Sequence, residues 1–166
     1  MSGIYVDENR KYQIDLTAAD WSTNKLHDLY KTIGNEMSDV DWIAETNSEV
    51  FLIEYKNTSF AGKNGKNDFY MKMWKKYYGS AFFMLSRRNV KPINFVCIVE
   101  PEIMDSVQRK RATASIKKRL PYVLQEDSDI FVPLIKDCYV LSIDEWNTEY
   151  PNFPFKPFVE VSELTG

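Results

Sequence analysis

The clearest strand-like pattern of hydrophobic and polar positions lies between residues 39 and 56, which read DVDWIAETNSEVFLIEYK. Two mainly apolar runs, 40–44 and 50–55, flank the polar dipeptide at 47–48. Runs of this length, rich in β-branched and aromatic residues and separated by a short turn, are typical of a β-hairpin. We therefore predict two antiparallel strands here.

The register of this hairpin brings charged side chains together. A two-residue loop pairs Thr46 with Glu49, and continued pairing places Asp41 directly opposite Glu54. Because side chains alternate between the two faces of a strand, Lys56 shares the face of both acids. Opposed residues have Cβ atoms about 4.5–5.5 Å apart, so two carboxylates there need a proton or a cation between them. Oxygen ligands suit Mg²⁺ or Mn²⁺, and the pattern predicts a divalent-metal site.

Helical periodicity predicts two helices around this hairpin. The first begins near Thr17, where 17–20 has capping-box spacing, and its apolar side is expected to face the sheet through Leu26, Leu29, Tyr30, Ile33 and Met37. On this helix His27 is expected to face away from the site. The second begins at 67–68 and carries a broad stripe that is expected to face the core, formed by Tyr70, Met73, Trp74, Tyr77, Tyr78, Ala81, Phe82 and Leu85.

Further elements follow toward the C-terminus. The apolar run 93–100 predicts a third strand, and 105–120 predicts a basic surface helix that ends at Pro121. Short strands are expected at 131–132 and 138–141. Ser142 has capping-box spacing to Glu145, which predicts a short helix.

The length of 166 residues predicts one domain with a sizeable core. Residues 1–16 are expected to contain a small N-terminal hairpin, and the proline- and aromatic-rich segment 147–166 is expected to pack as an irregular tail. The 44% hydrophobic and 14% aromatic content excludes a disordered chain. No apolar run is long enough to span a membrane, and the first residues lack the layout of a signal peptide. Cys97 and Cys138 lie in separate apolar runs, which predicts free buried thiols and a cytoplasmic protein.

The net charge of −3 conceals a strong asymmetry along the chain. Residues 1–57 carry 5 basic and 11 acidic side chains, 58–119 carry 14 basic and 4 acidic, and 120–166 carry 2 basic and 9 acidic. A basic middle segment is what a phosphate backbone requires. Simple solvation of two amphipathic helices explains the same pattern, and both interpretations stay open.

The arrangement of Asp41 followed by Glu54-Tyr55-Lys56 resembles the PD-(D/E)xK nuclease superfamily, which includes many restriction endonucleases and Holliday-junction resolvases. The resemblance covers roughly residues 17–100, and a valine precedes the aspartate where the family name has a proline. It implies an α/β, restriction endonuclease-like fold with an αβββαβ core, in which helices flank a central mixed sheet. A homodimer is also consistent with it.

The same resemblance implies roles for individual residues. Asp41, Glu54 and the backbone carbonyl of Tyr55 would bind Mg²⁺ or Mn²⁺, Glu36 from the first helix would assist them, and Lys56 would act on the attacking water. A solvated position at the helix end is an equal alternative for Glu36. The candidate phosphate contacts are the basic residues of the following loop and helix, namely Lys63, Lys66, Lys72 and Lys75.

The expected function is a metal-dependent endonuclease that hydrolyses phosphodiester bonds of nucleic acid, with DNA favoured over RNA. The alternative is a catalytically inactive, nuclease-like module that binds nucleic acid or a protein partner. In that case the pair Glu54–Lys56 is only a structural ion pair on a strand face. A magnesium titration distinguishes the two, because only the nuclease requires a bound metal.

Overall fold

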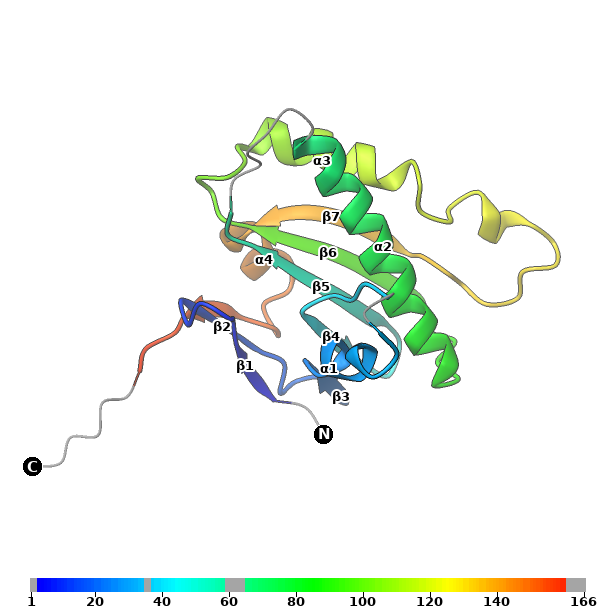
Figure 1. Ribbon diagram of the computed structural model, residues 1–166, viewed down its shortest axis with the longest axis horizontal. Coiled ribbons are helices and arrows are strands. Elements are labelled where there is room, and N and C mark those ends of the chain that lie inside the picture. The colour runs from blue at the N-terminus through cyan, green and yellow to red at the C-terminus, as the bar shows by residue number, and fades with distance from the viewer. Residues whose placement is uncertain (1–2, 35–36, 59–64, 161–166) are drawn as a thin grey trace, which may run out of the picture.

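The computed structural model describes residues 3–34, 37–58 and 65–160. It is a mixed α/β structure in which helices flank a five-stranded mixed sheet, and a small three-stranded sheet lies beside it (Figure 1). In chain order the elements are β1 (Ile4–Val6), β2 (Tyr12–Asp15), β3 (Trp21–Thr23), α1 (Leu26–Lys31), β4 (Trp42–Glu45), β5 (Val50–Lys56), α2 (Gly65–Ser86), β6 (Ile93–Val99), α3 (Ser106–Lys117), the 3-10 turn η1 (Leu124–Glu126), β7 (Asp137–Ser142), α4 (Ile143–Glu149) and β8 (Phe155–Pro157).

The large sheet has the strand order β3-β4-β5-β6-β7. Its first three strands are antiparallel, whereas β5, β6 and β7 run parallel. All seven residues of β6 are buried, because a parallel strand in the middle of such a sheet is covered on both faces. Helices α1, α2 and α3 cover one face, and α4 with the small sheet β1-β2-β8 covers the other.

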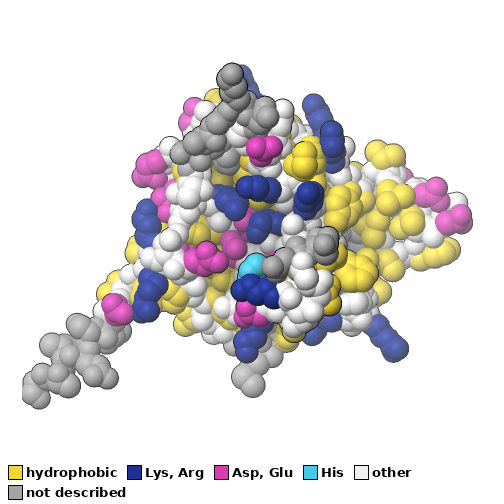
Figure 2. Space-filling model, viewed as in Figure 1, with side chains coloured by type: hydrophobic (Ala, Val, Ile, Leu, Met, Phe, Trp, Pro, Cys, Tyr) yellow, Lys and Arg dark blue, Asp and Glu magenta, His cyan; other side chains and the backbone are white. Residues whose placement is uncertain are grey.

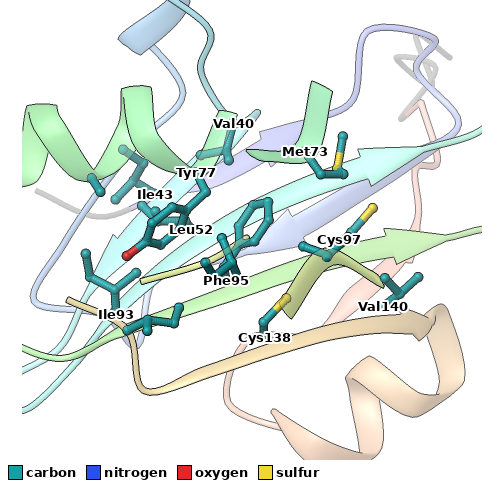
Figure 3. Close-up of a cluster of buried hydrophobic side chains, with 14 of the residues drawn as sticks. Val40, Ile43, Leu52, Met73, Tyr77, Ile93, Phe95, Cys97, Cys138 and Val140 are labelled. Carbon is teal, nitrogen blue, oxygen red and sulfur yellow. The ribbon is translucent and has the colours of Figure 1, made fainter. Parts of the chain in front are cut away.

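Strand alternation divides β5 between these two layers. Leu52 packs under α2 with Phe95, Met73 and Tyr77, as Figure 3 shows, whereas Ile53 packs in the layer beneath α4. The free thiols of Cys97 and Cys138 are buried in the α2 layer, which confirms the prediction for them. The even-numbered face of β5 therefore points toward α2, and this decides which helix reaches the candidate site.

The predicted start of the first helix is wrong. Residues 21–23 form strand β3, which pairs with β4, and α1 is confined to Leu26–Lys31. The hydroxyl of Thr17 donates to Asp15 at 2.6 Å in a tight turn, so the expected capping box does not form. Leu29 and Ile33 are exposed instead of facing the sheet. Extension of the sheet by β3 outweighs the local helix signal.

The element order also departs from an αβββαβ core. Two strands, β4 and β5, separate α1 from α2 in the described chain, and the third antiparallel strand, β3, precedes α1. The coarser prediction of a mixed sheet flanked by helices is confirmed.

The broad apolar stripe predicted for α2 is only half buried. Met73 and Tyr77 are in the core, but Tyr78, Phe82 and Leu85 are exposed, and that part of the prediction is wrong. The opposite flank of the helix is buried instead, because the backbone of residue 38 lies directly against Gly79. A Cβ added to this glycine would lie 1.9 Å from the carbonyl oxygen of Ser38.

The predicted N-terminal hairpin and the basic third helix are both present. The segment 131–132 is not a strand, but the strand around Cys138 forms as β7, and Ser142 caps α4 through a capping box with Glu145. The C-terminal segment is more regular than expected, because Phe155 lies in β8, which pairs with β2. None of the described helices is long and apolar enough to cross a membrane.

Candidate active site

The β4–β5 hairpin has the register that the sequence predicted. The ladder pairs Trp42 with Ile53, and the amide of Thr46 donates to the carbonyl of Glu49 at 2.9 Å across the turn. Beyond the last pair, the amide of Tyr55 donates to Oδ2 of Asp41 at 2.8 Å. Asp41 precedes the first residue of β4, and its side chain takes the place of a backbone carbonyl as the partner of the Tyr55 amide.

Glu54 lies at the centre of a cluster of charges. Its Oε1 is 2.9 Å from Nζ of Lys56, and its Oε2 is 3.0 Å from Nζ of Lys76 on α2. Although both ammonium groups are at ion-pair distance, neither is aligned for a hydrogen bond, and both buried oxygens lack a hydrogen-bond partner in the described structure. Lys76 also donates to the carbonyl of Asp39 at 2.6 Å. The lysine therefore links α2 to both sides of the hairpin.

The electrostatic field at the cluster perturbs two pKa values. Burial and, after it, the charge of Glu54 raise the pKa of Asp41 from 3.8 to about 7, against the opposing effects of Lys76, the Tyr55 amide and Lys56. Burial alone would lower the pKa of Lys56, but Glu54 and Asp41 outweigh it and leave that pKa above its ordinary value. Lys56 is therefore a cation at neutral pH, whereas Asp41 is only partly ionised there.

The cluster forms one wall of a cavity of about 510 Å³. The opposite walls come from the β1–β2 loop, through Asp7 and Asn9, and from α1, through His27. Figure 2 shows basic and acidic side chains gathered around this histidine, the one histidine of the sequence. Charged groups from four parts of the chain therefore surround a space that is open to solvent.

A polar clamp fixes the β1–β2 hairpin in this wall. The hydroxyl of Tyr55 donates to Oε1 of Glu100, which is buried just after β6, and Lys11 pairs with Oε2 at 2.7 Å. Asp7 accepts the amides of three residues of its own loop, Asn9, Lys11 and Tyr12. The loop is therefore held by its own Asp7 and, through Lys11, by Glu100 of the large sheet's β6 end.

The histidine of the cavity belongs to a pair. Nδ1 of His27 is 3.2 Å from Oδ1 of Asp39, and Asp39 is buried. The expectation that His27 faces away from the site is wrong, because α1 begins later and is placed differently from the predicted helix. Asp39 contacts one ring nitrogen of His27. The tautomer of the ring decides whether the other nitrogen donates or accepts a hydrogen bond.

The predicted site residues have different outcomes. Asp41, Glu54, Tyr55 and Lys56 line the cavity together. Glu36 and Lys63 lie outside the described residues. Lys66, Lys72 and Lys75 are exposed on α2 and do not line the cavity.

The charged residues next to the cluster that the sequence did not assign to the site include Asp39, His27 and Lys76. A usable signal existed for Lys76, which lies three residues after the buried Met73 and four before the buried Ser80 on the same helix. Helical neighbours at these spacings share a face, so Lys76 had to lie beside the buried arc. No comparable signal placed His27, because the position of α1 depends on the unexpected strand β3.

The charge balance of the cavity fits a cation. Its lining contains six acids, Asp7, Glu8, Asp28, Asp39, Asp41 and Glu54, and three lysines, Lys31, Lys56 and Lys76. Burial and, after it, the charge of Glu54 raise the pKa of Asp41. In the described part of the chain, no three His, Cys, Asp or Glu side chains are grouped closely enough to form a metal site by themselves. Any divalent ion here would therefore depend on Asp41, Glu54, backbone oxygen and water.

Comparisons of the chain with protein-family models, with curated proteins and with solved structures find no match in any of the three.

Proposed function

We propose that the chain is a metal-dependent endonuclease that hydrolyses phosphodiester bonds of nucleic acid, with DNA as the expected substrate. One observation carries the proposal: Asp41 and Glu54 lie close together just beyond the last pair of the β4–β5 ladder, with Lys56 beside Glu54, at an open cavity. Two acids and a lysine in this order also resemble the PD-(D/E)xK superfamily. A restriction endonuclease-like fold belongs to the same proposal and is supported by the sequence hairpin–α2–parallel β6.

The residues of the cluster suit distinct roles. Asp41, Glu54 and the carbonyl of Tyr55 would hold Mg²⁺ or Mn²⁺. When bound, such an ion lowers the pKa of water and offsets the negative charge that develops on the phosphoryl group. Lys56 stays protonated, so it orients the attacking water or contacts a phosphate oxygen and does not act as a base. Lys76 holds Glu54 in place from α2.

Substrate contacts are proposed on the surfaces next to the cavity. Lys72 precedes Lys76 by one helical turn and therefore lies on the cavity side of α2, which favours it over Lys75 as a phosphate contact. His27, held by Asp39, is placed at the rim, where it can contact a neighbouring phosphate. These contacts predict binding that weakens as the salt concentration rises.

The test is cleavage of supercoiled, linear and branched DNA, and of RNA, with Mg²⁺ or Mn²⁺ and with a chelator. Lys56→Ala is expected to reduce turnover by about a hundredfold while metal binding survives. Asp41→Ala and Glu54→Ala are expected to lose both. Glu49→Gln changes an acid at the far end of the same hairpin and serves as the matched control. Full cleavage by the Asp41→Ala, Glu54→Ala double variant overturns the proposal.

A second candidate is a nuclease-like module that binds nucleic acid without cutting it. The observation that favours it is the position of two lysines at ion-pair distance from Glu54, because a carboxylate compensated in this way needs no metal. Salt-dependent DNA binding, with no cleavage and no change on titration with Mg²⁺, would select this candidate.

A further inference from the structure

A long connection between α3 and β7 projects from the body of the molecule, and we call residues 121–135 the arm (Figure 1). Several of its apolar side chains point into solvent: Phe131 is 89% exposed, Val123 is 81% exposed and Leu124 is 56% exposed. The base of the arm is nevertheless fixed, because the side chain of Gln125 donates to the carbonyl of Ile135 and accepts its amide, both at 2.9 Å. The arm therefore presents its apolar residues on a defined support.

A second exposed apolar surface lies next to the arm on α2. We call it the outer stripe, and its members share one side of the helix: Met71, Tyr78, Phe82 and Leu85. The hydroxyl of Tyr77 donates to the carbonyl of Leu134, so the base of the arm is attached to this helix. Figure 2 shows hydrophobic side chains gathered over both elements on the same side of the molecule. Contiguous exposed apolar surface of this kind marks an interaction site.

The two surfaces carry opposite charges. The arm contains three acids, Glu126, Asp127 and Asp129, and no basic residue. Residues 69–99, which include nearly all of α2, contain basic residues and no acid. In the described chain no ion pair joins an arm acid to a base. The charges of the arm are therefore available to a partner.

We propose that two copies of this chain associate through these surfaces, the arm of each lying on the outer stripe of the other. One chain carries both complementary halves, so a two-fold axis satisfies both contacts at once. A hollow of about 480 Å³ at the base of the arm, lined by Pro92, Ile130 and Pro133, offers space for an apolar side chain of the second copy. Lys75, which flanks the outer stripe, and Lys118 at the end of α3 would meet the arm acids. The proposal does not depend on the nuclease function.

The first experiment measures the mass of the full chain in solution by light scattering and sedimentation velocity. The wild type is expected to have twice the mass of one chain at about 100 µM. Phe131→Asp and Val123→Asp are each expected to weaken dimerisation by about tenfold or more, since central apolar anchors dominate association energies. Both side chains are exposed in one copy, so these variants should fold normally, which circular dichroism checks. Val159→Asp, at a residue that is 75% exposed near the C-terminus, is the matched control and should remain dimeric.

A charge exchange tests which surfaces meet. Lys75→Glu with Lys118→Glu makes a variant with an acidic helix face, and Glu126→Lys with Asp129→Lys makes one with a basic arm. Each variant alone is expected to be mainly monomeric, and an equal mixture is expected to recover dimers, because both arm–stripe contacts then join opposite charges. A monomeric wild type, a larger assembly, a dimer that keeps its affinity in the arm variants, or a mixture that stays monomeric would each overturn the proposal.

Discussion

Replacement of Asp41 by asparagine tests the cost of ionising a buried acid next to Glu54 in the cavity. The substitution removes the titrating group and keeps the oxygen that accepts the hydrogen bond from the Tyr55 amide. It therefore separates the charge of residue 41 from its part in the ladder.

The magnitude follows from the raised pKa of Asp41. The change from 3.8 to about 7 corresponds to an upper limit of about 4 kcal/mol, and because the side chain is partly open to the cavity, solvent screening reduces this to about 2 kcal/mol. A carboxyl whose pKa is higher in the folded chain favours folding at low pH. Its contribution is present below about pH 4 and is lost as the pH rises through about 7.

The assay is urea unfolding of wild type and Asp41→Asn in a chelating buffer between pH 4.5 and 8.5. The free energy of unfolding of the variant is expected to rise by about 2 kcal/mol relative to the wild type across this range, because only the wild type forms a carboxylate at position 41 as the pH increases. Asp20→Asn, an exposed acid outside the cavity, is the control and should show no such trend. If the difference in the free energy of unfolding between Asp41→Asn and the wild type does not change with pH, the pKa of Asp41 is not raised in the folded chain. Under the proposed function, Mg²⁺ at pH 8 stabilises the wild type and not Asp41→Asn.

Two other substitutions test the packing around the cavity. Gly79→Ala is expected to destabilise the fold by about 3 kcal/mol, because its Cβ would meet the carbonyl oxygen of Ser38, and wild-type stability in a thermal melt would contradict this close approach. Lys76→Met is expected to cost about 3 kcal/mol, since it removes one partner of the buried Glu54. Because Lys76 lowers the pKa of Asp41, the same variant should shift the pH-dependent loss of stability above pH 7, which the urea series measures.

The hairpin could be predicted because local chemistry fixes it. The two-residue turn sets the pairing of Thr46 with Glu49, and the ladder continues this register to the pair Trp42–Ile53. Once that register is known, Asp41, Glu54 and Lys56 must share a side of the sheet. The central part of the candidate site is thus contained in about sixteen consecutive residues.

The rest of the cavity depends on how distant elements are placed. On α2 the widest apolar arc of the sequence includes Tyr78 and Phe82, which are exposed, and its centre lies away from Lys76. The true orientation is set by the contact between Gly79 and Ser38, which no periodicity reveals. His27 was likewise placed by a strand, β3, that is too short for a period-2 pattern to identify.

The clamp formed by Tyr55, Glu100 and Lys11 has a practical consequence for handling the protein. A wall of the cavity is built from the first dozen residues, and the pairing of Lys11 with Glu100 helps to hold that wall in place. An affinity tag fused close to the start of the chain, or trimming of the leading hairpin by a protease, would therefore remodel the pocket. Preparations tagged at opposite ends should therefore be compared before a lack of activity is interpreted.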